Sequence, residues 1–205
     1  FKRVPIVGDA VFGVMDWIQE IPKFYPKRDL SKPSLQVLTA AHFIKNNDWG
    51  KHLIGMLAKK PLPLLTPFFA TAIMAEVNHY PGPIYCVICD ADISRAWVSA
   101  EPAPSRIIYF APNERVVERL QQYGVSKSRI YLTGFPLPEE NLGRRYKVVS
   151  EDLKHRLLNL DPNRVYIKKY HDTLLKNLKI SNWPKKSNHP LTLTFAVGGA
   201  GAQRE

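Results

Sequence analysis

The 205 residues are 45% hydrophobic and carry a formal net charge of +11. This is a globular composition, and the chain is long enough for one domain or for one domain plus part of a second. The longest apolar stretch, PLPLLTPFFATAIMA at residues 61–75, is too short to span a membrane and is interrupted by three prolines. This stretch therefore does not predict a membrane-spanning helix.

The first predicted elements are helices. SKPSLQVLTAAHFIKNN, at residues 31–47, predicts a helix with Ser31 or Ser34 near its cap, and a second amphipathic piece follows around residues 53–57. Thr66-Pro67 predicts an N-cap followed by proline at the first helical position, for a helix that ends near residue 78.

Strands and helices then alternate. Apolar runs predict three strands, at residues 84–89, 106–110 and 129–134. IYCVIC is apolar almost throughout, which indicates burial on both faces of a parallel sheet. A helix is predicted from Pro112 to Gly124, with one apolar face. The alternation predicts an α/β protein with a Rossmann-like, doubly wound parallel sheet.

Residues 141–190 break this alternation. They predict two helical pieces, residues 151–159, opened by Ser150, and residues 163–179, followed by a linker at 182–190. The segment 141–190 holds 12 Lys or Arg and 4 Asp or Glu, a net +8. Such a patch indicates an anionic partner, either lipid headgroups, nucleic acid or a nucleotide, or else a solvated helical insert. No zinc-finger spacing or aromatic-rich RNA-binding strand accompanies it, which disfavours nucleic acid.

The only two cysteines, Cys86 and Cys89, have a CxxC spacing within a predicted buried strand. Because strand neighbours three apart point to opposite faces, they are interpreted as inert core thiols in a reducing compartment. A redox or metal role is the alternative. The six histidines show no metal-ligand spacing.

The chain ends on LTLTFAVGGAGAQRE, which predicts a strand at 191–197 that opens a new domain. Gly198, Gly199 and Gly201 follow, and a glycine-rich turn before a helix N-terminus suits a phosphate. Arg204 stands where the dinucleotide fingerprint needs a third glycine, and no Lys-Ser/Thr pair follows. Phosphate binding and a tight strand-to-helix turn therefore both remain open.

Residues 84–141 resemble the lipid-acceptor glycosyltransferases of the two-domain GT-B type. These include monogalactosyldiacylglycerol synthases, processive diacylglycerol glucosyltransferases and, more distantly, the peptidoglycan N-acetylglucosaminyltransferase. VICDADISRAW supplies Asp90 and Trp97 at the family's spacing, while Cys89 replaces a Thr and Ser94 replaces a His. RIYLTGFPLP matches the strand that ends in T-G-I-P, and TFAVGGAGAQ matches the glycine loop that opens the family's C-terminal domain.

The resemblance implies two Rossmann-like domains that face each other across a cleft. Residues 1–140 would be the acceptor domain, 141–190 a basic insert and linker, and 191–205 the start of the nucleotide-sugar domain. The family's catalytic base lies on an N-terminal loop that would precede Phe1, and most of the donor domain would follow Glu205. We therefore expect a fragment without activity of its own, and the catalytic residues stay unknown.

The same resemblance suggests site residues. The acceptor side would include Asp90, Asp92, Ser94, Arg95, Trp97, Gly134, Phe135 and Pro136, and the donor phosphate loop Gly198, Gly199, Ala200, Gly201, Ala202 and Gln203. Asp90 would orient an acceptor hydroxyl or cap a turn, and Trp97 would pack in the core or stack on the acceptor. A serine at position 94 cannot act unaided as a base near neutral pH.

The function implied by the resemblance is hexosyl transfer in the full-length protein, from a nucleotide-sugar, most simply a UDP-sugar, to a lipid or other hydrophobic acceptor. No metal and no cofactor besides the donor are expected. The location expected is cytoplasmic or peripheral to an anionic membrane reached through residues 141–190. The alternatives are a non-catalytic binding protein of the same fold and a nucleotide-sugar epimerase or hydrolase.

Overall fold

The computed structural model describes residues 13–14 and 16–193. The chain divides into two compact units, Phe1–Pro136 and Leu137–Glu205. The division falls close to residue 140, where the sequence predicts the end of the first domain. The first unit contains the parallel sheet, and the second contains the basic helical segment.

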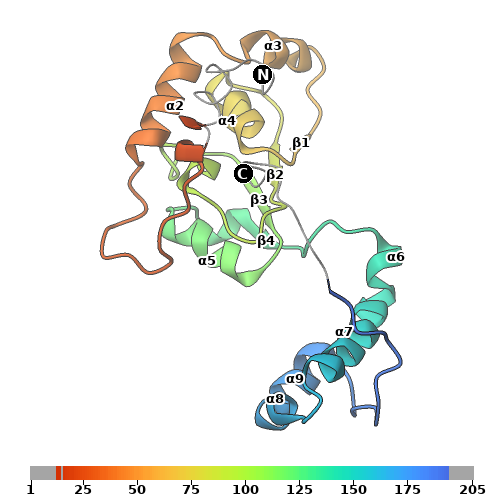
Figure 1. The fold of residues 1–205 in the computed structure, drawn as a ribbon. Coiled ribbons are helices and arrows are strands. Elements are labelled where there is room, and N and C mark those ends of the chain that lie inside the picture. The colour runs from red at the N-terminus through yellow and green to blue at the C-terminus, as the bar shows by residue number, and fades with distance from the viewer. Residues whose placement is uncertain (1–12, 15, 194–205) are drawn as a thin grey trace. The chain divides into compact units, whose positions relative to one another are not determined.

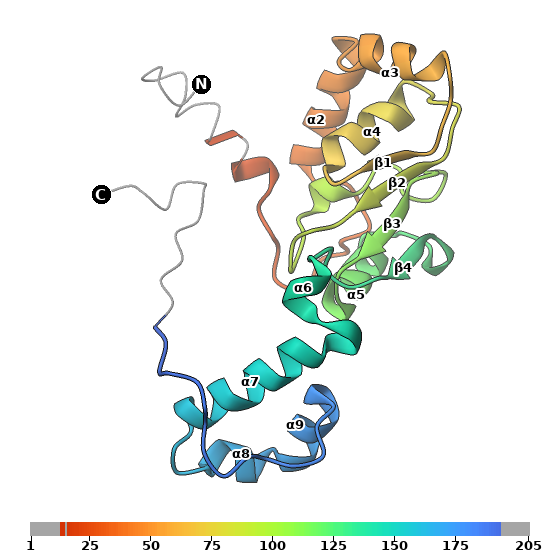
Figure 2. The ribbon, with the colours of Figure 1, turned by 90° about the vertical axis from the view of Figure 1, so that its right-hand side faces the viewer.

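Unit 1 is built around a four-stranded, wholly parallel sheet. Its strands are β1 (Leu64–Thr66), β2 (Ile84–Val87), β3 (Ile108–Ala111) and β4 (Ile130–Leu132). They lie across the sheet in chain order, as Figure 2 shows. The predicted α/β class with a Rossmann-like parallel sheet is confirmed.

The helices of unit 1 lie beside this sheet. They are α2 (Leu35–Asn46), α3 (Lys51–Ala58), α4 (Phe69–Val77) and α5 (Glu114–Gln122). Helix α4 joins β1 to β2, and α5 joins β3 to β4. Both crossovers run in the same direction across the sheet, and crossovers between parallel strands are right-handed, so both helices lie on the same face of the sheet. Figure 1 shows α2, α4 and α5 on the same side of the strands.

The two faces of the sheet differ in burial. Ile84, Cys86, Tyr109 and Ala111 are fully buried in the hydrophobic core. The alternate positions are more open: Leu65 is 61% and Tyr131 is 52% exposed, and Tyr85 stacks on Phe110 with ring centroids 5.6 Å apart. The prediction that Cys89 is a core thiol is wrong, because β2 ends at Val87 and Cys89 is exposed. Burial raises the pKa of the Cys86 thiol to about 12.

The structure differs from the sequence prediction at β1 and at the start of α4, and it decides between two candidate caps of α2. β1 was not predicted, because its three residues are bracketed by prolines and are too few to show a pattern. Thr66 does not cap α4. It ends β1, its Oγ accepts from the Phe68 N–H at 3.2 Å, and α4 begins at Phe69. At α2, Ser34 rather than Ser31 is the N-cap.

The described part of unit 2 contains helices and an irregular segment that follows them. The α-helices are α6 (Glu139–Leu142), α7 (Lys147–Leu160), α8 (Val165–Lys169) and α9 (His171–Leu178). α7 begins at Lys147, ahead of the predicted start at Ser150, and the single helix predicted over 163–179 is divided at Tyr170. Residues 191–193 form neither helix nor strand, and the rest of the strand predicted at 191–197 lies outside the described residues.

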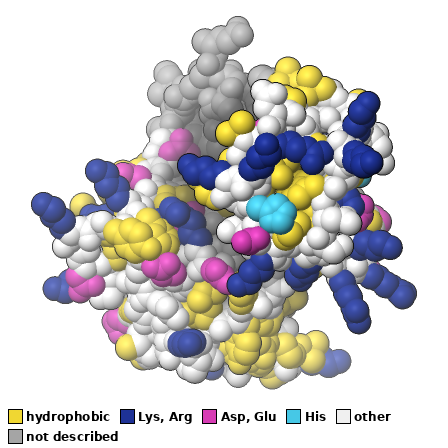
Figure 3. All heavy atoms as spheres, turned by 90° about the horizontal axis from the view of Figure 1, so that it is seen from below, with side chains coloured by type: hydrophobic (Ala, Val, Ile, Leu, Met, Phe, Trp, Pro, Cys, Tyr) yellow, Lys and Arg dark blue, Asp and Glu magenta, His cyan; other side chains and the backbone are white. Residues whose placement is uncertain are grey.

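The predicted linker at 182–190 lacks regular structure but is hydrogen-bonded to the helical part of unit 2. Arg164 donates to the carbonyls of Pro184 and Lys185, and Asn159 donates to that of His189. Buried residues of the described part of unit 2 are few: His155, Leu158, Ile167 and Leu178. Lys and Arg side chains project from many points of the surface drawn in Figure 3.

Candidate functional site

Because the strands are parallel, their carboxyl ends lie at one edge of the sheet, where ligands of α/β proteins bind. The hydrogen bonds between the strands continue slightly past the strand ends. The Ile88 N–H donates to the Phe110 carbonyl and the Thr133 N–H donates to the Ala111 carbonyl, both at 2.9 Å. Asp90 follows β2 and Gly134 follows β4. The two predicted motifs of unit 1 therefore end up on the expected edge of the sheet.

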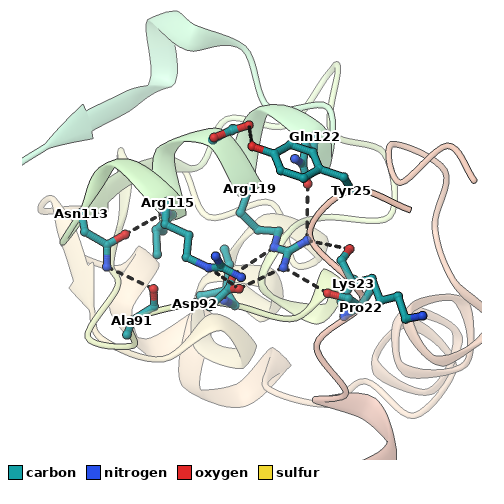
Figure 4. Close-up of polar contacts among 12 residues, drawn as sticks. Pro22, Lys23, Tyr25, Ala91, Asp92, Asn113, Arg115, Arg119 and Gln122 are labelled. Carbon is teal, nitrogen blue, oxygen red and sulfur yellow. Dashed lines mark hydrogen bonds and ion pairs between the residues drawn. The ribbon is translucent and has the colours of Figure 1, made fainter. Parts of the chain in front are cut away.

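Asn113 ties the loop after β2 to helix α5. Its side-chain oxygen accepts from the Val116 N–H at 2.8 Å, which caps α5. Its side-chain amide donates to the Ala91 carbonyl at 3.1 Å. One side chain thus satisfies a helix end and holds the neighbouring loop (Figure 4).

Asp92, a predicted acceptor-side residue, is occupied by two arginines (Figure 4). Arg115 lies 2.8 Å from its Oδ2, and Arg119 Nε lies 2.9 Å from its Oδ1. Partial burial opposes ionisation of Asp92, but hydrogen bonds from Arg119 and Arg115 outweigh it and lower the pKa to about 2. The carboxylate therefore positions two helix side chains instead of presenting itself to a substrate.

Arg119 extends this contact to a distant segment. It is fully buried, and it donates to the carbonyls of Pro22 and Lys23 at 3.1 and 3.3 Å. The Phe24 ring lies against the guanidinium, 4.5 Å from centroid to Cζ. Arg119 was not predicted as a site residue. Its acceptors are 96 and 97 residues away along the chain, so no local pattern could reveal them.

Arg95 is hydrogen-bonded to another residue of the same N-terminal segment, Ser31. Its guanidinium donates to the carbonyls of Val98 at 2.8 Å, Ser99 at 3.0 Å and Ser31 at 3.2 Å. Only 6% of the residue is exposed. Arg119 attaches residues 22 and 23 to helix α5, and Arg95 attaches Ser31 to the segment after β2.

Ser94 and Trp97, two other predicted acceptor-side residues, are both buried. Ser94 is 2% exposed, and its Oγ has no hydrogen-bond partner among the described residues. Trp97 is 5% exposed and packs on Phe69, with ring centroids 5.3 Å apart. Its carbonyl accepts from the Tyr109 hydroxyl at 3.1 Å. This geometry favours the packing interpretation of Trp97 over stacking on an acceptor.

Asp90 and residues 134–136 stay open to solvent. Asp90 is exposed and makes no hydrogen bond or ion pair with any other described residue. Gly134 has a φ of 86°, a left-handed conformation that glycine adopts without strain. Phe135 is 40% exposed, and Pro136 is the last residue of unit 1. Of the predicted acceptor-side carboxylates, Asp90 is the one placed to meet a ligand.

Three cavities accompany these elements in unit 1. One of about 160 Å³ lies at the N-terminus of α2 and is lined by Arg95, and one of about 180 Å³ has an almost wholly apolar lining between α2 and α4. A wider, open cavity of about 800 Å³ includes Glu76, Tyr80 and Arg106. Tyr80 precedes β2 and Arg106 precedes β3, so the wide cavity lies at the amino ends of the strands. None of the three was predicted from the sequence.

The predicted donor phosphate loop, Gly198–Gln203, lies outside the described residues. Among the residues that the structure describes, no group of three or more His, Cys, Asp or Glu could hold a metal ion. Over the same residues, none of the helices combines the length and the apolar character that crossing a membrane requires.

The fold defines an α/β protein with a Rossmann-like parallel sheet, and Asp90 is exposed in the loop that follows β2. Comparison with known proteins goes no further: no protein-family model, curated protein or solved structure matches the chain.

Proposed function

We propose that the chain is part of a GT-B type glycosyltransferase that moves a sugar from a nucleotide-sugar, most simply a UDP-hexose, to a lipid or other hydrophobic acceptor. One observation carries the proposal. The segments that resemble this family, around Asp90 and around Gly134, follow β2 and β4 of one parallel sheet, with β3 between them, and both end at its carboxyl edge. The nearly apolar cavity between α2 and α4 supports a hydrophobic acceptor.

In this reaction the acceptor hydroxyl oxygen forms a bond to the anomeric carbon, and the bond from that carbon to the diphosphate breaks. The proton of the hydroxyl passes to a base, and the nucleoside diphosphate leaves. Exposed Asp90 is suited to accept a hydrogen bond from the hydroxyl and so to orient it. Asp92 is paired with two arginines and Ser94 is buried, so neither serves as the base.

The direct test, made on the full-length protein because the chain alone is expected to be inactive, is transfer of labelled hexose from UDP-glucose, UDP-galactose or UDP-N-acetylglucosamine to diacylglycerol in mixed micelles. Transfer that falls at least tenfold in Asp90→Asn, and is unchanged in the matched variant Asp48→Asn, supports the proposal. Asp48 is an exposed carboxylate on another part of unit 1. Release of free sugar would indicate a hydrolase, and an altered donor would indicate an epimerase; either product without transfer contradicts the proposal.

A non-catalytic binding protein of the same fold is the second candidate. The buried Ser94 favours it, because the family has a titratable histidine at this position and the serine hydroxyl makes no hydrogen bond in the described structure. Binding of a UDP-sugar, detected by calorimetry without any turnover, would select this candidate over the enzyme.

The basic helical segment suggests where the protein would meet a membrane. Residues 141–190 carry a net +8, and their cations include Lys168, Lys169 and Arg145 on short helices and turns. We propose that this segment attracts anionic lipid headgroups. Co-sedimentation with phosphatidylserine vesicles should fall in Lys168→Glu/Lys169→Glu. Tighter binding to DNA than to vesicles, with a steep salt dependence, would instead favour nucleic acid.

A further inference from the structure

Arg95 and Arg119 are both buried arginines of unit 1, but only one has a counter-charge. Arg119 is 0% exposed and makes two contacts with Asp92. Arg95 is 6% exposed, and all its acceptors are backbone carbonyls. Its Nε–H has no acceptor in the described part of the chain. Burial lowers the pKa of Arg95, but an arginine remains protonated in proteins. The carbonyls and the Tyr123 ring, 5.7 Å from Cζ, are uncharged partners, so the guanidinium is buried without a counter-charge and an anion beside it would be stabilised.

The cavity that Arg95 lines has room for such an anion. It measures about 160 Å³ and lies at the N-terminus of α2, a helix of 12 residues. Arg28 and Lys32 also line it, together with Ser34 and Gln36 of the first turn. The first N–H groups of a helix and its dipole favour negative charge at this point.

Two carboxylates, Glu20 and Asp29, line the same cavity. Asp29 is engaged locally, because its Oδ1 accepts from the N–H and hydroxyl of Ser31 at 2.9 and 2.7 Å. The three cations exceed the two carboxylates, and the helix N-terminus adds positive partial charge. The net charge of the residues that line the cavity is therefore positive.

The second cavity continues along the same helix. It measures about 180 Å³, and α2 contributes Val37, Ala40, Ala41 and Ile44 to its lining. Aromatic residues, Trp49, Phe68 and Phe69, and the small residues Ala70, Ala96 and Ala100 form other walls. Ile18 lines both cavities, so the polar and the apolar one adjoin.

We infer that these adjoining cavities bind one single-chain amphiphile, with a phosphate monoester headgroup beside Arg95 and the start of α2, and the alkyl chain between α2 and α4. An apolar cavity of about 150 Å³ accommodates benzene, so the second cavity has room for roughly six carbons of a chain. Burial of each methylene tightens binding about fourfold. The affinity should therefore rise with chain length up to about six carbons and then level off.

The experiment is isothermal titration of the intact protein with ethyl, butyl, hexyl and octyl phosphate, with inorganic phosphate and hexanol as single-feature controls. Hexyl phosphate should bind at least a hundredfold more tightly than either control. Tryptophan fluorescence gives a second readout, because Trp49, one of four tryptophans, lines the apolar cavity. No gain in affinity from ethyl to hexyl phosphate would overturn the proposal, and so would equal affinity for hexanol.

Two matched pairs of variants assign the binding to these cavities. Arg28→Ala should weaken hexyl phosphate binding about tenfold, and Lys27→Ala, an exposed neighbour outside the lining, should not. Ala40→Leu fills the apolar cavity and should abolish the dependence on chain length, whereas Thr39→Leu on the exposed side of α2 should preserve it. Thermal melts confirm that each variant is folded.

Equal effects within both pairs of folded variants would place the amphiphile elsewhere and overturn the assignment. The inference does not depend on sugar transfer. Amphiphile binding without sugar transfer would support this site and contradict only the proposed reaction. Sugar transfer without saturable binding of hexyl phosphate would support the reaction and contradict this site.

Discussion

Asp92 holds Arg119 through two contacts, and the guanidinium in turn holds the carbonyls of Pro22 and Lys23. Asp92→Asn removes the negative charge and leaves a fully buried guanidinium without a counter-charge. We expect the free energy of unfolding to fall by about 3 kcal/mol, measured by urea denaturation. Asp90→Asn, two residues away and exposed, should change it by less than about 0.5 kcal/mol. Equal effects of the two substitutions would contradict the structural role of Asp92.

The pH dependence of stability follows from the same carboxyl group. Its pKa is lowered in the folded protein from 3.8 to about 2. A lowered pKa contributes stability that is present above the unfolded value and is lost as the pH falls through the folded value. Asp92 should therefore contribute about 2 kcal/mol at neutral pH, and this contribution should decline between roughly pH 5 and pH 2. Urea titrations should show a smaller loss over that range in Asp92→Asn than in the unchanged protein.

Helix α5 and the loop after β2 are joined by Asn113, so a single substitution should affect both elements. Asn113→Ala removes the cap of α5 and the hydrogen bond to the Ala91 carbonyl, and we expect a loss of about 1–2 kcal/mol. Asn113→Asp retains the cap acceptor and loses the donor, so its cost should be smaller. Chemical denaturation separates the two variants. Identical losses would mean that the cap of α5 contributes nothing, because both variants lose the contact with Ala91 and only Asn113→Ala loses the cap.

The elements with strong local signals were predicted from the sequence. β2, β3 and β4 were found from apolar runs, and α5 from its apolar face and from Gly124, which has a φ of 88° after the helix. The failures have local causes as well. Three residues between prolines are too few to reveal β1, and a Thr-Pro pair indicates a helix start even where threonine ends a strand.

The candidate site was predicted only in part, because its geometry depends on distant contacts. The sequence placed Asp90, Asp92 and Arg95 in one loop after a strand, and the structure keeps them there. It could not show that Asp92 is neutralised by Arg119 while Arg95 has no carboxylate. The sequence also could not show the cavities along α2, because their walls come from segments far apart in the chain. Arg95, for example, donates to the Ser31 carbonyl, 64 residues away. The spacing of residues in the sequence identifies the loop after β2. Which of its side chains are free to contact a ligand depends on contacts with residues that are distant in the sequence.

At the scale of the whole molecule, the two units differ in how much they bury. The contiguous cluster around Ile84, Ile88 and Tyr109 belongs to unit 1, while the described part of unit 2 buries little beyond Leu158, Ile167 and Leu178. Stability follows buried apolar area, so unit 2 should unfold at a lower urea concentration than unit 1. We expect amides of α7 to exchange with solvent faster than those of β2 and β3, measured by hydrogen exchange and mass spectrometry.

A matched pair of core substitutions tests whether the units unfold separately. Ile167→Ala should shift only the first unfolding transition, because Ile167 is 3% exposed within unit 2. Ile88→Ala, fully buried in unit 1, should shift only the second, and each should cost about 2–5 kcal/mol in its own unit. Two independently shifting transitions would mean that the basic segment can unfold and refold while the sheet and its cavities persist. One cooperative transition, moved equally by both substitutions, would mean that the two cores are energetically coupled.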